Sequence, residues 1–214
     1  MSDEVRVVRV GPDNWEAWRD VRLEALRDAP TAFGSTYENQ VGRTEQQWRD
    51  RLHPANGLTC LSMLDDRIVG MAAGHPEGDG VIELISMWVS PDARRRGVGD
   101  ALVDEVVRWA REQHADAVEL WVTRGNDPAE RLYARHGFLR TGAVQPLPSD
   151  PALDEMAMRL PLGWFVGARP GRREERRPTN PLPVRPGRRE RGTPVPSGDE
   201  PSDMPGRWLS PRWP

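Results

Sequence analysis

The pattern of apolar and polar positions along the chain predicts a mixed α/β domain. Apolar or alternating runs typical of strands lie at 5–10, 58–64, 68–74, 81–89, 117–122, 138–143 and 155–160. Apolar residues three and four positions apart predict helices at 15–27, 44–52, 99–113 and 129–136. The short turns after 58–64 and 68–74 predict antiparallel neighbours, whereas the strand–helix–strand order predicts that 117–122 runs parallel to 81–89. We therefore expect a mostly antiparallel sheet with flanking helices.

Capping residues mark the starts of two of these helices. Thr44 and Gln47 have the spacing of a capping box. Asn126 and Pro128 combine a side-chain cap with a proline just inside the first turn. Gly137 follows the second helix and is a candidate for a left-handed cap at its end.

A basic loop interrupted by glycines follows the predicted strand at 81–89. Three arginines at 94–96 precede Gly97 and Gly99, and a helix begins there. The N–H groups of a first helical turn lack intrahelical partners, and the helix dipole favours negative charge at that end. Glycine lets the backbone approach a bulky anion closely. The loop is therefore predicted to hold a pyrophosphate.

Two common pyrophosphate sites do not fit this loop. A P-loop requires a lysine after its last glycine, and this chain contains no lysine. A dinucleotide fingerprint needs a third small residue at position 102, which is Leu102. ATP hydrolysis of the Walker type is thereby excluded, and a dinucleotide site is a poor match.

The loop resembles the acyl-CoA loop of the Gcn5-related N-acetyltransferases (GNAT). That pattern is Arg or Gln, two variable residues, Gly, one variable residue, and Gly or Ala, and it is matched by Arg94, Gly97 and Gly99. Asn126 and the run 130–138, which contains Leu-Tyr followed three residues later by Gly-Phe, resemble the family's later motif. The resemblance covers residues 5–160. It implies the GNAT fold, in which two parallel strands splay apart at the acetyl-CoA site.

The resemblance also implies which residues contact acetyl-CoA. Met87 and Val89 are expected to act through their main chain, which pairs with the pantetheine arm and supplies an oxyanion donor. Asp100 departs from the pattern because its carboxylate would lie near the phosphates, although a first helical turn also favours acids. The full predicted set is Met87, Trp88, Val89, Arg94, Arg95, Arg96, Gly97, Val98, Gly99, Asp100 and Asn126.

The chemistry implied is direct attack of a neutral amine on the thioester. Tyr133 stands where the family places its general acid, and a neutral phenol can donate a proton to the thiolate; the alternative is a purely packed tyrosine. The amine must first lose a proton. Glu83 is the first candidate for that base, Glu119 the second and His75 the third, and each could instead be a solvated or ion-paired group.

The loop at 29–37 is the predicted acceptor region, since the family places its acceptor site between the first two helices. Its aromatic and hydroxyl residues give the candidate substrate contacts Phe33, Ser35 and Tyr37, to which Glu119 is added as a fourth. The alternative is a packed loop with Phe33 as its plug.

Charge divides the chain into two parts. Residues 1–162 carry 19 Arg and 27 acidic residues, a net charge of −8, whereas residues 163–214 carry 11 Arg and 6 acidic residues, a net charge of +5. The acidic part favours a cationic acceptor, such as an amine, over nucleic acid. The second part also contains 11 prolines and few aliphatic residues, so residues 163–214 are predicted to be a disordered tail.

The single cysteine and the lack of a long apolar run indicate the compartment and limit the possible partners. Cys60 is the only cysteine, which argues against disulfides and a zinc cluster, and no metal is expected. Neither an apolar signal core nor a membrane-spanning run is evident, so we expect a cytoplasmic protein with no membrane partner.

The sequence thus predicts an acetyl-CoA-dependent N-acetyltransferase formed by residues 1–162, acting on a primary amine of a small molecule or a peptide N-terminus, with a homodimer as one assembly state left open. The alternative is a CoA-binding regulatory module without turnover that acts through its basic tail; the tail could also have no function. Deletion of residues 163–214 separates these readings, because only the regulatory module would lose its partner.

Overall fold

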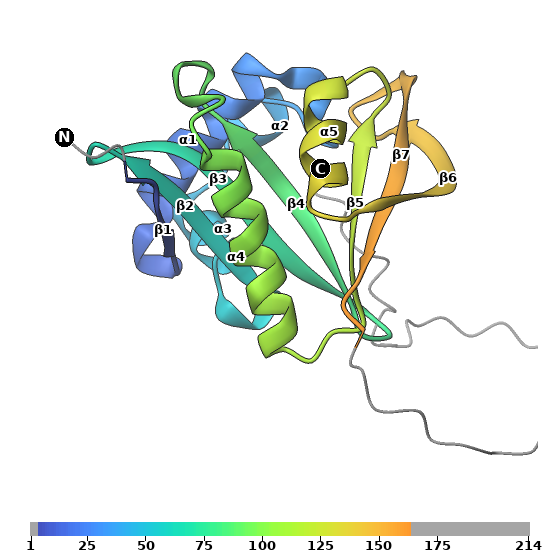
Figure 1. Cartoon of the computed structure of the whole chain (residues 1–214). Helices are drawn as coiled ribbons and strands as arrows, with labels where there is room; N and C mark the ends of the chain where they lie inside the picture. Colours follow the sequence, from blue (N-terminus) through green and yellow to red (C-terminus); the bar gives the residue numbers. More distant parts are fainter. Residues whose placement is uncertain (1–3, 164–214) are drawn as a thin grey trace, which may run out of the picture. The chain divides into compact units, whose positions relative to one another are not determined.

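The structure is a computed structural model, and it describes residues 4–163 (Figure 1). The strands are β1 (Arg6–Arg9), β2 (Leu58–Leu64), β3 (Arg67–Gly78), β4 (Val81–Val89), β5 (Ala117–Thr123), β6 (Leu139–Leu147) and β7 (Asp150–Pro161). The helices are α1 (Trp15–Asp28), α2 (Glu38–Val41), α3 (Glu45–Arg51), α4 (Val98–Glu112) and α5 (Asp127–Arg135). The predicted tail, apart from Gly163, lies outside the described residues.

The strands form one sheet in the order β1-β2-β3-β4-β5-β7-β6. All neighbours are antiparallel except β4 and β5, which run parallel, as predicted. The parallel pairing is short: it joins residues 81–83 to residues 117–119 and then ends. The predicted mixed fold with splayed parallel strands is therefore confirmed.

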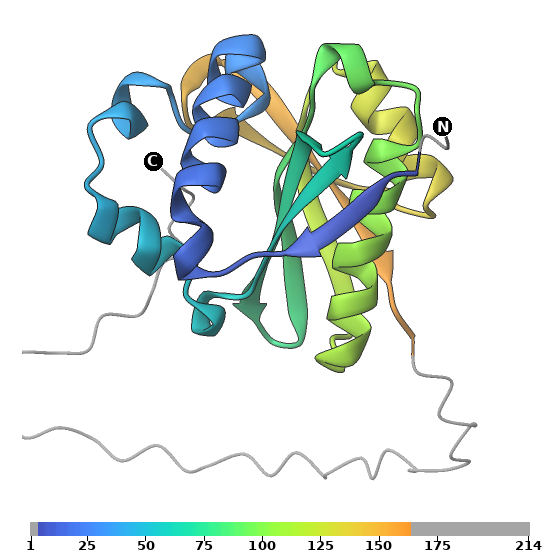
Figure 2. The same cartoon turned by 90° about the vertical axis from the view of Figure 1, so that its left-hand side faces the viewer.

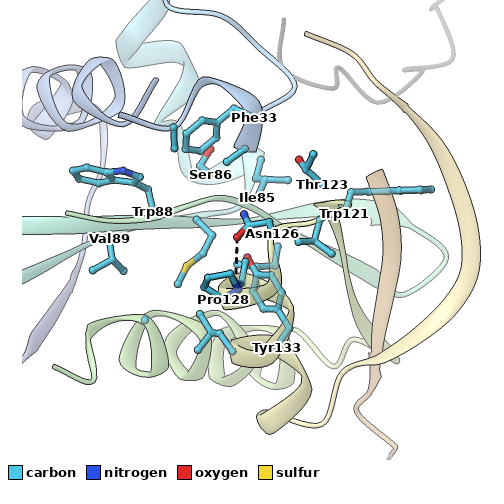
Figure 3. Close-up of a pocket in the computed structure, with 18 of the residues that line it drawn as sticks. Phe33, Ile85, Ser86, Trp88, Val89, Trp121, Thr123, Asn126, Pro128 and Tyr133 are labelled. Atoms are coloured by element: carbon cyan, nitrogen blue, oxygen red, sulfur yellow. Dashed lines mark hydrogen bonds between the residues drawn. The ribbon is translucent and has the colours of Figure 1, made fainter. Parts of the chain in front are cut away.

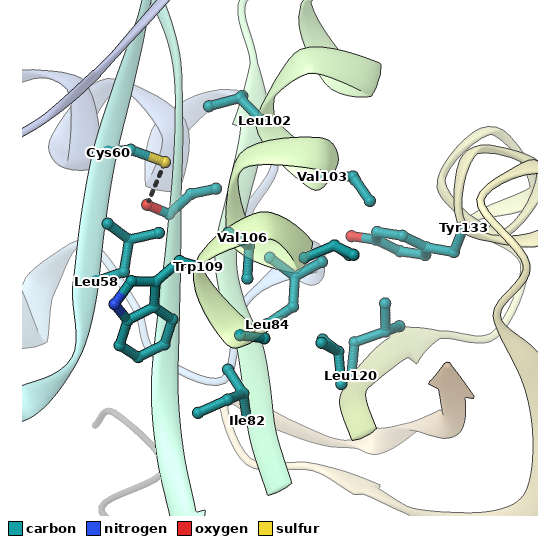
Figure 4. Close-up of a cluster of buried hydrophobic side chains, with 14 of the residues drawn as sticks. Leu58, Cys60, Ile82, Leu84, Leu102, Val103, Val106, Trp109, Leu120 and Tyr133 are labelled. Carbon is teal, nitrogen blue, oxygen red and sulfur yellow. Dashed lines mark hydrogen bonds between the residues drawn. The ribbon is translucent and has the colours of Figure 1, made fainter. Parts of the chain in front are cut away.

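Helices cover both faces of the sheet, and each face has its own apolar cluster (Figure 2). On one face, α4 packs Leu102, Val103 and Val106, all fully buried, against β2, β3 and β4 (Figure 4). On the other face, α1 and α3 contribute Trp18 and Trp48, which are also fully buried. Burial of a large apolar side chain stabilises a fold by about 1.5–3 kcal/mol, so these two layers fix the helices on the sheet.

The predicted element order is correct, with differences at the ends of elements. The short helix α2 lies between the predicted loop at 29–37 and the predicted helix at 44–52, where no element is predicted from the sequence. The strands β6 and β7 extend well beyond the predicted 138–143 and 155–160. Most side chains of β6 are exposed, so they show no apolar alternation from which its length could be predicted. The predicted caps are present, since Thr44 and Gln47 form a capping box and Asn126 caps α5.

Cys60 lies in β2 and is fully buried, as expected of a small apolar residue. Burial raises the pKa of its thiol to about 12, so it stays protonated at neutral pH. Within residues 4–163, no group of three His, Cys, Asp or Glu side chains is arranged to hold a metal ion. None of the helices in that range is long and apolar enough to cross a membrane.

The two-layer core makes a direct prediction about stability. Leu102→Ala removes a fully buried side chain between α4 and the sheet, and should lower the free energy of unfolding by about 3 kcal/mol. Leu139→Ala is the matched control, because Leu139 is 68% exposed. Urea unfolding of both variants measures the difference. Equal losses for the two variants would contradict the packing described here.

Candidate functional site

A bulge in β4 organises the candidate site. In the pairing of β3 with β4, Met71 faces Trp88 and Ala73 faces Ile85, so Ser86 and Met87 together oppose one residue of β3. Ser86 has a left-handed φ of 57°, an unusual conformation for a residue other than glycine. Such a bulge bends the strand and re-aims its backbone.

The bulge also reverses which face the side chains of β4 occupy. Before it, Ile82 and Leu84 belong to the cluster under α4. After it, Trp88 packs with α1 and α3, whereas Met87 and Val89 return to the α4 face.

A cavity of about 800 Å³ opens where β4 and β5 diverge (Figure 3). Beyond Glu83, the side of β4 that faces β5 has no strand partner within residues 4–163. Unpaired N–H and C=O groups of a strand edge can bind an extended ligand. The cavity reaches from the first turn of α4 to the loop that contains Phe33, and so it is lined from both faces of the sheet.

The predicted anion loop forms one end of this cavity. Gly97 is the N-cap of α4 and has a left-handed φ of 80°, with open space where a Cβ would stand. Gly99 serves a different purpose, because a Cβ there would lie 3.1 Å from Leu132 on α5. The left-handed conformation of Gly97 leaves the N–H groups at the start of α4 free to bind a ligand. The missing side chain of Gly99 lets α5 approach α4.

The three arginines of the loop have different surroundings. Arg94 donates to Asp28 at 2.6 Å and to the carbonyl of Val89 at 3.1 Å, and it lines the cavity. Arg95 also lines the cavity. Arg96 lies 3.7 Å from Asp65 and is not among the lining residues. Two of the three predicted cations are therefore brought to the cavity.

Asp100 lines the cavity, and its carboxylate is bound by residues at the end of α5. Arg135 donates to it at 2.7 and 2.9 Å, and His136 lies at 2.9 Å. The hydrogen bonds from Arg135, followed by that from His136, lower the pKa of Asp100 to about 2. The charge that the sequence places next to the predicted pyrophosphate is thus offset within the protein.

The three remaining predicted cofactor contacts, Trp88, Val98 and Asn126, differ in how they are placed relative to the cavity. Trp88 donates its indole N–H to Asp28 at 2.9 Å. Val98 is only 1% exposed and is not among the lining residues, so the structure does not bring it to the cavity. Asn126 accepts from the N–H of Ala129 at 3.4 Å and lines the cavity (Figure 3).

Tyr133 extends from α5 to the wall of the cavity, where it is 6% exposed (Figures 3 and 4). Its ring packs against Phe138 with centroids 5.9 Å apart. Burial raises the pKa of its phenol above the ordinary value of 10, so the group is a neutral donor at pH 7. Tyr133 is therefore a packed core residue and also stands at the cavity.

The three candidate bases lie in one row across the sheet. Glu83 is directly opposite Glu119 on β5 and opposite His75 on β3. Glu83 lines the cavity where the strands separate. Glu119 does not line it and accepts from Arg159 at 3.2 Å, while the Nδ1 atom of His75 lies 2.8 Å from the carbonyl of Asn56. Of the three, Glu83 is best placed to reach a bound substrate.

Only one of the predicted acceptor residues in the loop reaches the cavity. Phe33 is part of its lining. Ser35 is 1% exposed and its hydroxyl is held by Arg22 and Gln40, so the structure does not bring it to the cavity. Tyr37 packs under the guanidinium of Arg27 and is also absent from the lining.

Several lining residues were not predicted from the sequence. They come from the β5 edge, from the β6–β7 hairpin and from α1, and include Trp121, Thr123, Pro148, Glu155 and Arg22. Only Arg22 had a signal in the sequence, as the charged interruption of the apolar face of its helix.

Comparison with known proteins agrees with this geometry. The model of the Acetyltransferase (GNAT) family matches residues 15–138, which is more than half of the chain. The chain belongs to this family.

Curated relatives match more than half of the chain. The mycothiol acetyltransferase of Thermobifida fusca is 29% identical over 143 residues, covering 63% of this chain and 43% of the relative. That of Geodermatophilus obscurus is 32% identical over 143 residues, covering 64% and 44%. The chain thus spans less than half the length of these relatives.

Solved structures share the fold at low sequence identity. A GNAT acetyltransferase from Streptococcus pneumoniae superposes with a TM-score of 0.60 at 20% identity, covering 75% of this chain and all of the other. A putative acetyltransferase from Salmonella typhimurium, solved with its cofactor acetyl-CoA, has a TM-score of 0.59 at 18% identity, covering 77% and 98%.

The buried phenol can be tested directly, because the chain has only two tyrosines. In the Tyr37→Phe variant, absorbance at 295 nm reports Tyr133 alone. We expect Tyr133 to ionise at a higher pH in the folded variant than in the same variant unfolded in urea, where its pKa should be about 10, the ordinary value for tyrosine. Equal midpoints would show that Tyr133 is not buried as described.

Proposed function

We propose that this chain is an acetyl-CoA-dependent N-acetyltransferase that acetylates a primary amine by direct attack. The observation that carries the proposal is the cavity in which the bulged edge of β4, the start of α4 and Tyr133 come together. Family membership supports the reaction class, and the acceptor is proposed to be a small molecule or a peptide N-terminus. The acceptors to be tested first include amines related to mycothiol, because the curated relatives bear that name.

The lining residues fit acetyl-CoA. The N–H groups of the first turn of α4, together with Arg94 and Arg95, suit a pyrophosphate. The edge of β4 at Met87 and Val89 suits the amide-bearing pantetheine arm, as one strand suits another. Since Asp100 is already paired with Arg135, its charge is offset before the phosphates bind.

Each part of the chemistry has a candidate group. Acetyl-CoA supplies a thioester: the amine nitrogen bonds to the acetyl carbon, and the carbon–sulfur bond breaks to release the CoA thiol. Glu83, through water, would accept the proton that an alkylammonium must lose before it attacks. A backbone N–H at the bulge would stabilise charge on the carbonyl oxygen. Tyr133 would give its proton to the departing thiolate and regain one from the nitrogen as the amide forms.

The cofactor site yields the first test of this proposal. Gly97→Glu places a Cβ on a left-handed residue and a carboxylate beside the predicted pyrophosphate, so acetyl-CoA binding should weaken by at least about 100-fold. Gly42→Glu is the control, since it makes the same charge change at a glycine with open space and without a left-handed φ. Calorimetric titration with acetyl-CoA measures both. Equal affinities would refute the anion loop.

The proton acceptor yields the second test. Glu83→Gln should lower turnover at pH 7 by about 100-fold and flatten the acidic limb of the rate profile, because the amide cannot take up a proton. Glu119→Gln should keep that limb. The rate of CoA release between pH 5.5 and 9 measures both. An acidic limb that persists unchanged in Glu83→Gln would remove Glu83 as the base.

A further inference from the structure

A buried arginine stands at the acceptor side of the cavity with no anionic partner. Arg22, on α1, is 2% exposed and lines the cavity beside Phe33. Its guanidinium lies 4.5 Å from the centre of the Phe33 ring and donates to Ser35 at 2.8 Å and to Gln40 at 3.3 Å. Its remaining nitrogen, Nη1, is buried and has no hydrogen-bond partner.

The charges around Arg22 make its burial unfavourable in the free protein. No ion pair within the described part of the chain involves Arg22. Burial and the nearby Arg43 lower the pKa of Arg22 to about 9, so it remains a cation at neutral pH. Arg51 is also buried, and Arg22 and Arg43 contribute to lowering its pKa. A buried charge without a counter-charge is costly.

The neighbouring buried cation, Arg51, reaches the β4 bulge. Arg51 donates to the hydroxyl of Ser86 at 3.3 Å, and Ser86 is the left-handed residue of the β4 bulge. The loop predicted to hold the phosphates of acetyl-CoA belongs to the opposite side of the sheet, at the start of α4. The Arg22 region is therefore available to the acceptor and is separate from the phosphate site.

A purely structural role does not require the charge of Arg22. The side chain could brace the loop at 33–40 through Ser35 and Gln40. Those two residues, however, already bond to each other, with the Gln40 amide donating to the Ser35 hydroxyl at 2.7 Å. A neutral donor would complete such a brace without the cost of burying a cation.

We propose that Arg22 binds a carboxylate carried by the acceptor, which makes the acceptor a small zwitterion of the amino-acid type. The inference rests on the proposed function and names the substrate class of the same site. Glu83 lines the same cavity and would face the ammonium end, so the two ends of such a molecule meet opposite charges. The net negative charge of the domain is compatible with this arrangement, because the cation is confined to one buried position.

Matched acceptor pairs test the inference on the full chain. Free amino acids and dipeptides are compared with their carboxamides, in which a neutral amide replaces the anionic group, and CoA release is measured. Wild type should favour the carboxylates by at least about 10-fold in kcat/KM, mainly through KM, as expected for one charge-assisted contact. Arg22→Gln should bring the ratio near one. Arg19→Gln, on the same helix but away from the cavity, should keep it.

A binding measurement separates this inference from the proposed reaction. N-acetylleucine and its carboxamide are titrated into CoA-saturated protein, without turnover. The inference is supported if wild type binds the carboxylate selectively and Arg22→Gln loses that selectivity, even if no amine is acetylated. The absence of acetylation would refute only the proposed reaction. Equal kcat/KM within the pairs, or equal binding of the two probes to wild type, would overturn the inference. These comparisons use wild type, so they stand even if Arg22→Gln does not fold.

Discussion

The parallel pairing of β4 with β5 ends after residue 83 on β4, and the rest of the site depends on that limit. If the pairing continued, the β4 edge would be satisfied by hydrogen bonds and the cavity between the strands would not exist. The bulge at Ser86 reinforces the separation, because it turns the backbone of β4 and exchanges the faces of its side chains. The two apolar layers hold the diverging strands in place.

The charged residues that line the cavity also differ between the two faces of the sheet. On the α4 face, the helix start and two arginines suit an anion, and the one acid among them is held by Arg135. On the α1 face, Arg22 and Glu83 stand on the wall of the same cavity with opposite charges. A donor entering from one face and an acceptor entering from the other would meet at the bulge, where the backbone N–H groups and Tyr133 are found.

Local patterns were enough to predict most of the fold and one end of the site. Helix periodicity, the cap at Asn126 and the glycines of the loop are each encoded within a few residues, and they are found as predicted. The row formed by His75, Glu83 and Glu119 depends on strand register, which no local pattern specifies. The burial of Ser35 and the missing counter-charge of Arg22 depend on packing between distant segments, so the sequence alone could not predict either of them.

The most direct measurement is a crystal structure of the protein with acetyl-CoA. The account predicts the pyrophosphate at the N–H groups of residues 97–100, the pantetheine arm along the edge of β4 and the thioester near Met87 and Tyr133. Acetyl-CoA bound elsewhere, or a β4 edge that pairs fully with β5 in the complex, would contradict it.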